Sequence, residues 1–344
     1  MKFKKLLILI VILFAIIVVS FIKKANLDKN AAIENQPPPP TMVTQEIAPG
    51  FVSKLLISKG SEEAGRLLTV SKNGGGEWVI DSHFNTKARK SQVESVLKNL
   101  SGLKGEFRSD SKDVLEDYSL LETQAYHLEL QGSDNQALAH VLVSPLRTRG
   151  TKNFVRNAKS STVVVTDSDI LTSLGLYSKD AKLDYKMFAD FKVVVTEASK
   201  IQSLELTQPK STPFLMTKRE DVKNKTVTWI SGMADKEITL ETGKVNELIS
   251  NILNLYAKES ADPAGTVYGF NEKAAPWIRI QLKPEEKPNE IMLFLGLRFE
   301  ATKTYFLKSI PDGQVYALSD ASIDAILKKN SDSFLTSAAL AKKS

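Results

Sequence analysis

A run of basic residues between positions 147 and 159 is the part of this sequence with the strongest chemical character. The segment RTRGTKNFVRNAK contains five basic side chains and no acidic one. Guanidinium and ammonium groups clustered in this way bind phosphate and carboxylate oxygens. The segment is therefore a candidate anion-binding patch for lipid headgroups or an anionic envelope polymer, and the alternative is a solvated hairpin whose charges protect a sheet edge. The patch consists of Arg147, Arg149, Lys152, Arg156 and Lys159.

The three histidines could in principle hold a metal ion. His83, His127 and His140 are scattered, however, whereas zinc ligands usually come at short, paired spacings. His127 and His140 are placed to face each other across a predicted hairpin of residues 125–130 and 137–144. The sequence predicts no metal site and no cofactor.

Two other patterns have a catalytic and a structural interpretation. The pairs Asp167 with Asp169 and Asp320 with Asp324 could act as general acid and base, but each pair lies where a strand enters a short helix. Carboxylates cap free backbone N–H groups there, so we predict capping. Gly74–Gly76 precedes a strand, whereas a phosphate loop precedes a helix, so we predict a hairpin turn. We predict no catalytic residue and a protein that is not an enzyme, with an envelope hydrolase using unidentified carboxylates as an alternative.

Composition restricts the classes of protein further. The chain has 344 residues and no cysteine, which excludes disulfides, thiolate metal sites and cysteine nucleophiles. Five of its 46 basic residues lie in residues 1–24, which contain no acid, so the rest of the chain carries 41 basic residues (46 minus 5) against 40 acidic ones. Because the remainder is nearly neutral, we expect no nucleic-acid partner.

The N-terminus has the pattern of a membrane anchor. Residues 6–22 read LLILIVILFAIIVVSFI, 17 residues without a charge and flanked by lysines, which is enough for a short transmembrane helix. A cleaved signal peptide is the alternative, but the run is longer than a usual h-region and has no small-x-small cleavage site at its end. The basic N-terminal residues favour a cytoplasmic N-terminus. The residues chosen to represent the anchor are Leu6, Ile10, Phe14, Val18 and Ile22.

This pattern predicts a location and a first division of the chain. We expect a single-pass protein of the bacterial cytoplasmic membrane, in contact with the bilayer through residues 1–24 and with most of the chain outside the cytoplasm. Residues 25–50 are polar and contain Pro37–Pro40. They are predicted to be a stiff spacer that holds the folded part away from the bilayer.

The rest of the chain repeats itself at an offset near 152 residues. The apolar face of a helix at Val93, Val96, Leu97 and Leu100 recurs at Val245, Leu248, Ile249 and Ile252. A tryptophan precedes each helix, at positions 78 and 229, and an alternating strand follows at 126–130 and 278–282. The sequence therefore predicts an α+β fold of two duplicated units, each with mostly antiparallel sheet and one long packing helix. We predict the first unit at 51–190, the second at 191–335, and a tail at 336–344.

These elements resemble the bacterial family called domain of unknown function 4340. The matching segments are Trp78, 93–103, Tyr118-Ser119-Leu120 and 163–174 in the first unit, and Trp229, 245–255, Tyr268-Gly269-Phe270 and 315–327 in the second. At Ser119 the family favours glycine. The resemblance implies an envelope protein of unknown chemistry, sometimes encoded beside ABC-type permeases and gliding-motility auxiliary proteins, and it assigns no catalytic residue.

The resulting hypothesis is a non-catalytic, membrane-anchored scaffold or auxiliary component of a membrane complex, for which an ABC-type transport or gliding-type system is the candidate. The alternative is an anion-binding module for envelope polymer or lipid that acts through the basic hairpin.

Overall fold

The structure is a computed structural model of the 344-residue chain. It describes residues 17–20, 23–24, 41–60, 65–147, 152–178, 180–208, 211–221, 223–224, 226–233, 236–271 and 276–337. Of the predicted anchor residues, Val18 is described, whereas Leu6, Ile10, Phe14 and Ile22 lie outside these ranges, as does Arg149 of the basic patch. Among the helices in the described ranges, none combines the length and apolar character needed to cross a bilayer.

The first unit is built on a ten-stranded antiparallel sheet. The neighbouring strands all run in opposite directions, and helix α2 (Lys90–Leu100) and the short helix α3 (Ile170–Ser173) accompany the sheet. In order across the sheet the strands are β1 (Thr41–Met42), β6 (Lys104–Ser109), β10 (Val163–Thr166), β9 (Asn153–Asn157), β8 (Ala137–Arg147), β7 (Tyr126–Gln131), β2 (Lys54–Lys59), β3 (Arg66–Lys72), β4 (Trp78–Ile80) and β5 (Thr86–Lys87).

The second unit is built on a nine-stranded antiparallel sheet, with helices α4 (Thr242–Leu253) and α5 (Asp320–Leu327). Its strands, in order, are β15 (Glu259–Ala261), β19 (Val315–Ser319), β18 (Thr304–Ile310), β17 (Glu290–Phe299), β16 (Ile278–Leu282), β11 (Ile201–Leu206), β12 (Phe214–Asp221), β13 (Thr226–Met233) and β14 (Lys236–Thr239). The prediction of mostly antiparallel sheet with few helices is confirmed, and there are two sheets.

Apart from β1, which extends the first sheet beyond β6, the strand orders of the two sheets are the same. When each sheet is followed from the strand that comes after its long helix, β6-β10-β9-β8-β7-β2-β3-β4-β5 corresponds one to one with β15-β19-β18-β17-β16-β11-β12-β13-β14. Leu128 and Leu130 of β7 are buried in the first core, and Ile280 and Leu282 of β16 are buried in the second, 152 residues later.

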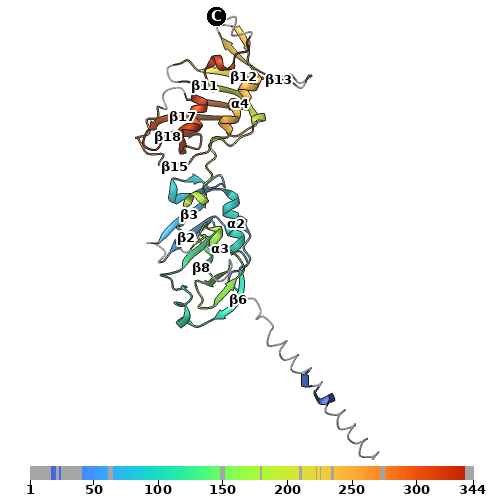
Figure 1. The fold of residues 1–344 in the computed structure, drawn as a ribbon, viewed down its shortest axis with the longest axis vertical. Coiled ribbons are helices and arrows are strands. Elements are labelled where there is room, and N and C mark those ends of the chain that lie inside the picture. The colour runs from blue at the N-terminus through green and yellow to red at the C-terminus, as the bar shows by residue number, and fades with distance from the viewer. Residues whose placement is uncertain are drawn as a thin grey trace, which may run out of the picture.

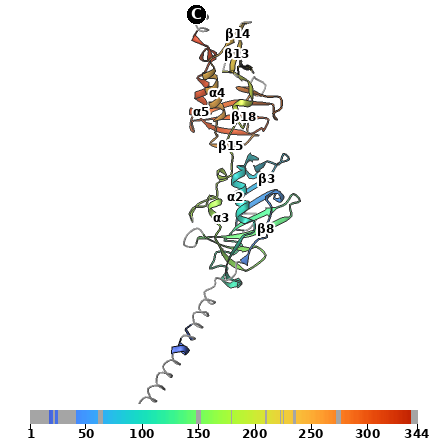
Figure 2. The same cartoon turned by 90° about the vertical axis from the view of Figure 1, so that its right-hand side faces the viewer.

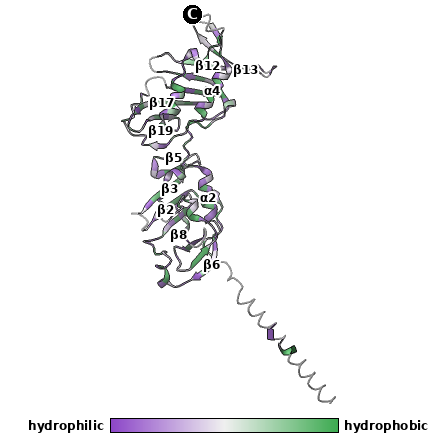
Figure 3. Ribbon diagram, viewed as in Figure 1, coloured by the Kyte–Doolittle hydropathy of each residue, from purple (hydrophilic) through white to green (hydrophobic). Residues whose placement is uncertain are grey.

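One face of each sheet is covered by its long helix. Val93, Val96 and Leu100 of α2 have no exposed surface, and their counterparts on α4 are buried in the same way. Residues at i, i+3, i+4 and i+7 form one stripe of a helix, and burial of such a stripe stabilises it against the sheet by about 1.5–3 kcal/mol per large apolar side chain. The alternation of hydrophobic and hydrophilic residues along the strands can be followed in Figure 3.

In each unit, a segment near the end of the unit is hydrogen-bonded to the start of the long helix. The amide of Arg89, just before α2, donates to the carbonyl of Phe188 at 2.6 Å. In the same way the amide of Glu241, just before α4, donates to Phe334 at 2.8 Å. Phe188 and Phe334 each follow or end a 3-10 turn and are fully buried. These contacts supply partners for backbone groups that a helix start leaves free.

Residues 41–50, which the sequence analysis included in the spacer, pack against the first unit. Thr41 and Met42 pair with Gly105 and Lys104 at the edge of β6. Val43 and Thr44 are buried, and Thr44 Oγ1 accepts a hydrogen bond from the amide of Leu103 at 2.9 Å. The backbone pairing supplies a stabilisation that the polar composition of this segment did not predict.

The two units are stacked end to end (Figure 1, Figure 2). Phe191 in the connecting segment packs against the core clusters of both units. Around it, Lys87 Nζ lies 3.0 Å from Asp312 Oδ2, and Gln314 Nε2 donates to the carbonyl of Asn85 at 3.2 Å. The junction therefore combines one shared apolar side chain with polar contacts from both units.

Candidate functional site

The side chain of Arg147, the first residue of the predicted patch, contacts other residues of the first unit. Its guanidinium lies 3.6 Å from Asp169 Oδ1 and donates to Thr172 Oγ1 at 3.2 Å and to the carbonyl of Leu176. These contacts join the end of β8 to α3. Arg298 near the end of β17 has the same role, because it donates to Asp320 Oδ2 at 2.9 Å at the start of α5. This guanidinium holds the pKa of the Asp320 carboxyl below its ordinary value.

Arg156 is buried and also faces inward. Its Nε donates to the carbonyl of Leu120 at 2.9 Å, and its Nη1 donates to the carbonyls of Ala158 and Ser160, each at 3.1 Å. Burial lowers the pKa of this guanidinium. One cation thus holds together the loop before β7 and the loop after β9.

The two described lysines of the patch are exposed. Lys152 Nζ forms an ion pair with Asp167 Oδ1 at 2.6 Å, and its pKa is raised by the hydrogen bond with that carboxylate. Lys159 is exposed on the loop after β9. Arg156 and Lys159 line one pocket of about 500 Å³, together with Lys112. Arg147 instead contacts Asp169 and Thr172, and sequence alone could not reveal these partners because they lie more than 20 residues away.

The predicted contact between two histidines is present. His127 Nδ1 lies 3.1 Å from His140 Nε2, and His127 Nε2 lies 2.8 Å from the carbonyl of Glu122. A carbonyl can only accept, so His127 Nε2 carries the proton and Nδ1 accepts from His140. In the described part of the chain, no group of three or more His, Asp or Glu residues could hold a metal ion.

The acidic pairs and the glycine run have structural roles. Asp169 accepts a hydrogen bond from the amide of Thr172 at 3.1 Å and caps α3, as predicted. In α5 the cap is Ser319, without a side-chain bond to the backbone, and Asp320 follows in the first turn. Gly74–Gly76 forms the turn between the paired strands β3 and β4, so the hairpin prediction is confirmed.

Ser119 has a φ of +50°, and Gly269 at the equivalent turn has +71°. Serine therefore takes the left-handed conformation that the resemblance associates with glycine.

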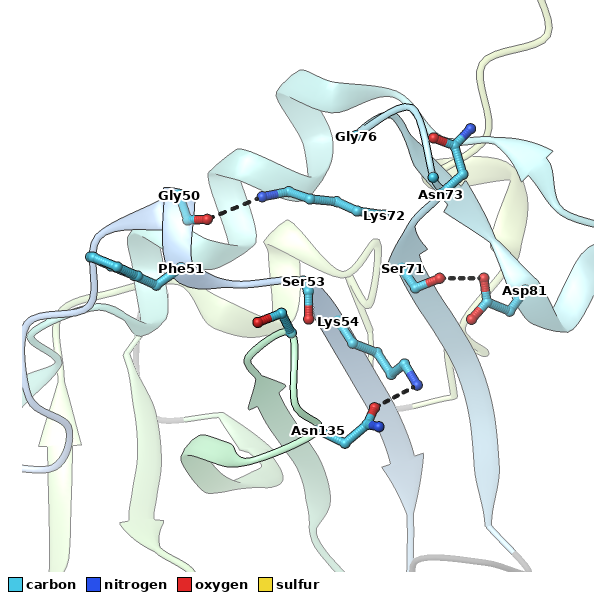
Figure 4. Close-up of a pocket in the computed structure, with 12 residues that line it drawn as sticks. Gly50, Phe51, Ser53, Lys54, Ser71, Lys72, Asn73, Gly76, Asp81 and Asn135 are labelled. Atoms are coloured by element: carbon cyan, nitrogen blue, oxygen red, sulfur yellow. Dashed lines mark hydrogen bonds between the residues drawn. The ribbon is translucent and has the colours of Figure 1, made fainter.

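A polar pocket of about 630 Å³ lies at one end of the first sheet (Figure 4). It is formed by the segment before β2, the turn after β3 and the turn between β7 and β8. Lys54 Nζ donates to Asn135 Oδ1 at 3.2 Å, and Lys72 Nζ donates to the carbonyl of Gly50 at 3.4 Å. Ser71 Oγ donates to Asp81 Oδ1 at 2.7 Å, while Phe51 is 76% exposed beside the lysines.

The chemistry that this pocket offers is binding. Its two ammonium groups, serine hydroxyls and asparagine amides can donate to a small polar or anionic ligand. Sequence reasoning missed the pocket because its residues come from three turns and share no spacing. The glycine run was the only local signal, and it correctly indicated a turn.

The fold defines a two-sheet α+β protein. The sequence profile of the family described as Domain of unknown function (DUF4340) matches residues 78–264, more than half of the chain, and the protein belongs to that family. The match begins at Trp78 on β4 and continues through the junction to the turn after β15. No curated protein and no solved structure matches the chain.

Proposed function

We propose that this chain is a non-catalytic, single-pass protein of the bacterial cytoplasmic membrane, whose two units present docking surfaces to a membrane complex. The bulk of the chain lies outside the cytoplasm, and an ABC-type permease is the preferred partner. The two units derive from one duplicated ancestor. The observation that carries the proposal is the pair of sheets with one strand order, joined end to end through Phe191. Two units joined end to end extend farther from the membrane than one unit would, and each unit can contact a different partner.

Two further features support this assignment. The apolar run of residues 6–22 precedes the first described strand by fewer than twenty residues, so the first unit is the one nearer the bilayer. In addition, the strongly basic residues that could have served an anion-binding protein are used within the first unit, where Arg147 and Arg156 hold loops and a helix in place. The geometry thus favours the docking function over anion binding at that hairpin.

Chemical cross-linking of the full-length protein in intact cells, followed by mass spectrometry, tests the proposal. We expect cross-links to an integral membrane component, with each cross-linked lysine assigned to one of the two units. The control replaces residues 1–24 with a cleavable signal peptide, which releases the folded part from the membrane and removes these cross-links. Recovery of the protein alone, although it is inserted correctly, would contradict a stable complex.

A further inference from the structure

The two lysines at the polar pocket of Figure 4 have counterparts in the second unit. Lys72 pairs with Trp78 across the ladder of β3 and β4, as Lys218 pairs with Trp229 across the ladder of β12 and β13. The Nζ of each of these lysines also donates at 3.4 Å to a backbone carbonyl of the segment before the neighbouring strand, β2 or β11. Lys218 therefore has the same place in the second unit that Lys72 has in the first.

The other pair of lysines lies at the beginning of two equivalent strands. Lys54 is the first residue of β2, and Lys200 immediately precedes β11. The ammonium of Lys54 contacts Asn135 in the turn between β7 and β8, and that of Lys200 contacts Glu286 in the turn between β16 and β17. Because these strands and turns correspond in the strand order of the two sheets, the two lysines occupy equivalent places.

The two units differ in how these ammonium groups are neutralised. In the second unit, Lys218 Nζ lies 2.6 Å from Glu220 Oε1, and Lys200 Nζ lies 3.2 Å from Glu286 Oε2. In the first unit the lysines donate to an uncharged carbonyl and an uncharged amide, and neither forms an ion pair with an acidic residue in the described part of the chain. The fold therefore permits a counter-charge at both places, and only the first unit leaves two positive charges available to a ligand.

The charges at the pocket also limit the kind of ligand. Asp81 is the one acidic residue among the described residues of the lining, and its Oδ1 accepts from Ser71 Oγ at 2.7 Å. Two positive charges against one negative charge favour an anionic ligand. Lys54 and Lys72 point to different sides of the pocket (Figure 4). A ligand that contacts both lysines therefore carries more than one anionic group.

The rest of the lining is polar apart from one aromatic ring. Phe51 is 76% exposed and is the only apolar side chain among the described residues that line the pocket, so an acyl chain would find too little apolar surface there. The Oδ1 of Asn73 accepts from the amides of Gly75 and Glu77, which leaves its Nδ2 group to donate to a ligand. A sugar ring fits these properties, because its hydroxyls bond to polar groups while its C–H face packs on an aromatic ring.

We propose that this pocket binds an acidic saccharide, one that carries two or more carboxylate or phosphate groups. The ammonium groups of Lys54 and Lys72 bind the anionic groups, the amide of Asn73 donates to a hydroxyl, and Phe51 packs against one face of a sugar ring. The pocket volume of about 630 Å³ is within the range of about 300–1,000 Å³ that small-molecule sites occupy. This binding activity is separate from the proposed docking to a membrane complex.

Isothermal titration calorimetry of the full-length protein in detergent tests the inference. The probes are trigalacturonate, which carries carboxylates, and glucose 1,6-bisphosphate, which carries phosphates, so the tighter ligand identifies the anionic group. Maltotriose is the neutral control, and citrate supplies three carboxylates without a sugar ring. We expect at least one acidic saccharide to bind, and maltotriose and citrate to bind at least about tenfold more weakly.

The most informative variant is Asn135→Asp, which places a carboxylate opposite Lys54 as Glu286 is placed opposite Lys200. It should weaken the binding of the acidic saccharide by roughly tenfold. Aspartate accepts the left-handed conformation of Asn135, which has a φ of +60°, so this variant should fold. Lys72→Met should have a similar effect, because it removes the second ammonium group. Glu286→Gln, which removes the matching carboxylate from the second unit, is the control and should bind as the wild type does.

Three outcomes would overturn the inference. They are no binding of either acidic saccharide, binding of citrate as tight as that of the saccharides, and an affinity that neither Asn135→Asp nor Lys72→Met changes. The titration uses purified protein and needs no membrane partner. Its failure would therefore leave the cross-linking result intact, and a failure of the cross-linking would leave the saccharide site intact.

Discussion

The two units use the same sheet but differ on the face that the long helix does not cover. Under α2 and α4 the apolar stripe is preserved position by position. On the opposite face, the first unit has His127 bonded to its own loop, whereas the buried Nε1 of Trp277 in the second unit has no hydrogen-bond partner among the described residues. The side chains under the long helix are buried in both units and must therefore be apolar, so this face maintains the fold. The other face is free to acquire a separate role in each unit.

The largest expected effect tests the preserved face. Leu100→Ala in α2 and Ile252→Ala in α4 each remove a side chain that is at most 1% exposed. Each should lower the free energy of unfolding of its own unit by about 2–5 kcal/mol. Urea unfolding followed by tryptophan fluorescence reports both units, with Trp78 in the first and Trp229 and Trp277 in the second.

The exposed Lys98 of α2 provides the matched control, because Lys98→Ala should change stability by less than about 0.5 kcal/mol. If either core variant lowered the urea midpoints of both units equally, the two units would unfold as one cooperative unit. Their stabilities could then not be compared separately.

The next effect concerns the diverged face of the first unit. Arg156→Met leaves the carbonyls of Leu120, Ala158 and Ser160 without their donor. We expect a loss of about 2 kcal/mol in the first unit and faster hydrogen exchange in residues 112–125. Lys159→Met, in the same segment but exposed, is the control and should leave both quantities unchanged. Equal effects of the two variants would mean that charge, and not the buried contacts, matters here.

A smaller effect should be shared by both units. Arg147→Met removes the link between β8 and α3, and Arg298→Met removes the corresponding link between β17 and α5. The first should lower stability by about 1 kcal/mol and the second by less, because Arg147 also donates to Thr172 and to Leu176. Thermal unfolding of both variants measures the difference. A larger loss for Arg298→Met would contradict the ranking drawn from these contacts.

The smallest effect is a pH dependence confined to the first unit, which contains all three histidines. His83 stacks on Tyr185 with ring centroids 3.9 Å apart, and burial lowers its pKa below the ordinary value of 6.5, although Asp184 opposes this. The unfolded chain therefore binds the proton more readily. Stability is complete above pH 6.5, declines as the pH falls below that value, and levels off below the pKa of the folded state.

Urea unfolding at about pH 7.5 and about pH 5.5 measures this dependence. In His83→Phe, which keeps an aromatic ring against Tyr185, the part due to His83 should vanish, while the transition of the second unit should not respond to pH in either protein. An unchanged pH dependence in His83→Phe would show that His83 is not its source.

Several features of the fold could be predicted from sequence because they are local or periodic. The stripes of α2 and α4 follow the helical period, and Gly74–Gly76 marks a turn by its composition. The contact between His127 and His140 follows from a hairpin with an obvious alternating pattern. The family resemblance rests on the same elements, and the family match agrees with it.

The remaining features depend on which distant groups meet. Residues 41–50 join the first unit because the edge of β6 offers backbone partners to Thr41 and Met42 at Gly105 and Lys104, far away in the chain. Likewise, Arg147 and Arg156 donate to the carbonyls of Leu176 and Leu120, which lie 29 and 36 residues away in the chain. A guanidinium has the same charge whether it faces solvent or a carbonyl, so its sequence context does not reveal its role.

The sequence by itself determined the class of the fold, the doubled pattern and the family, because apolar periodicity records which residues must leave water. Only the tertiary structure decided which of the polar residues serve the fold and which remain available at a pocket. That distinction depends on hydrogen-bond partners and burial, and both are properties of groups brought together from separate strands.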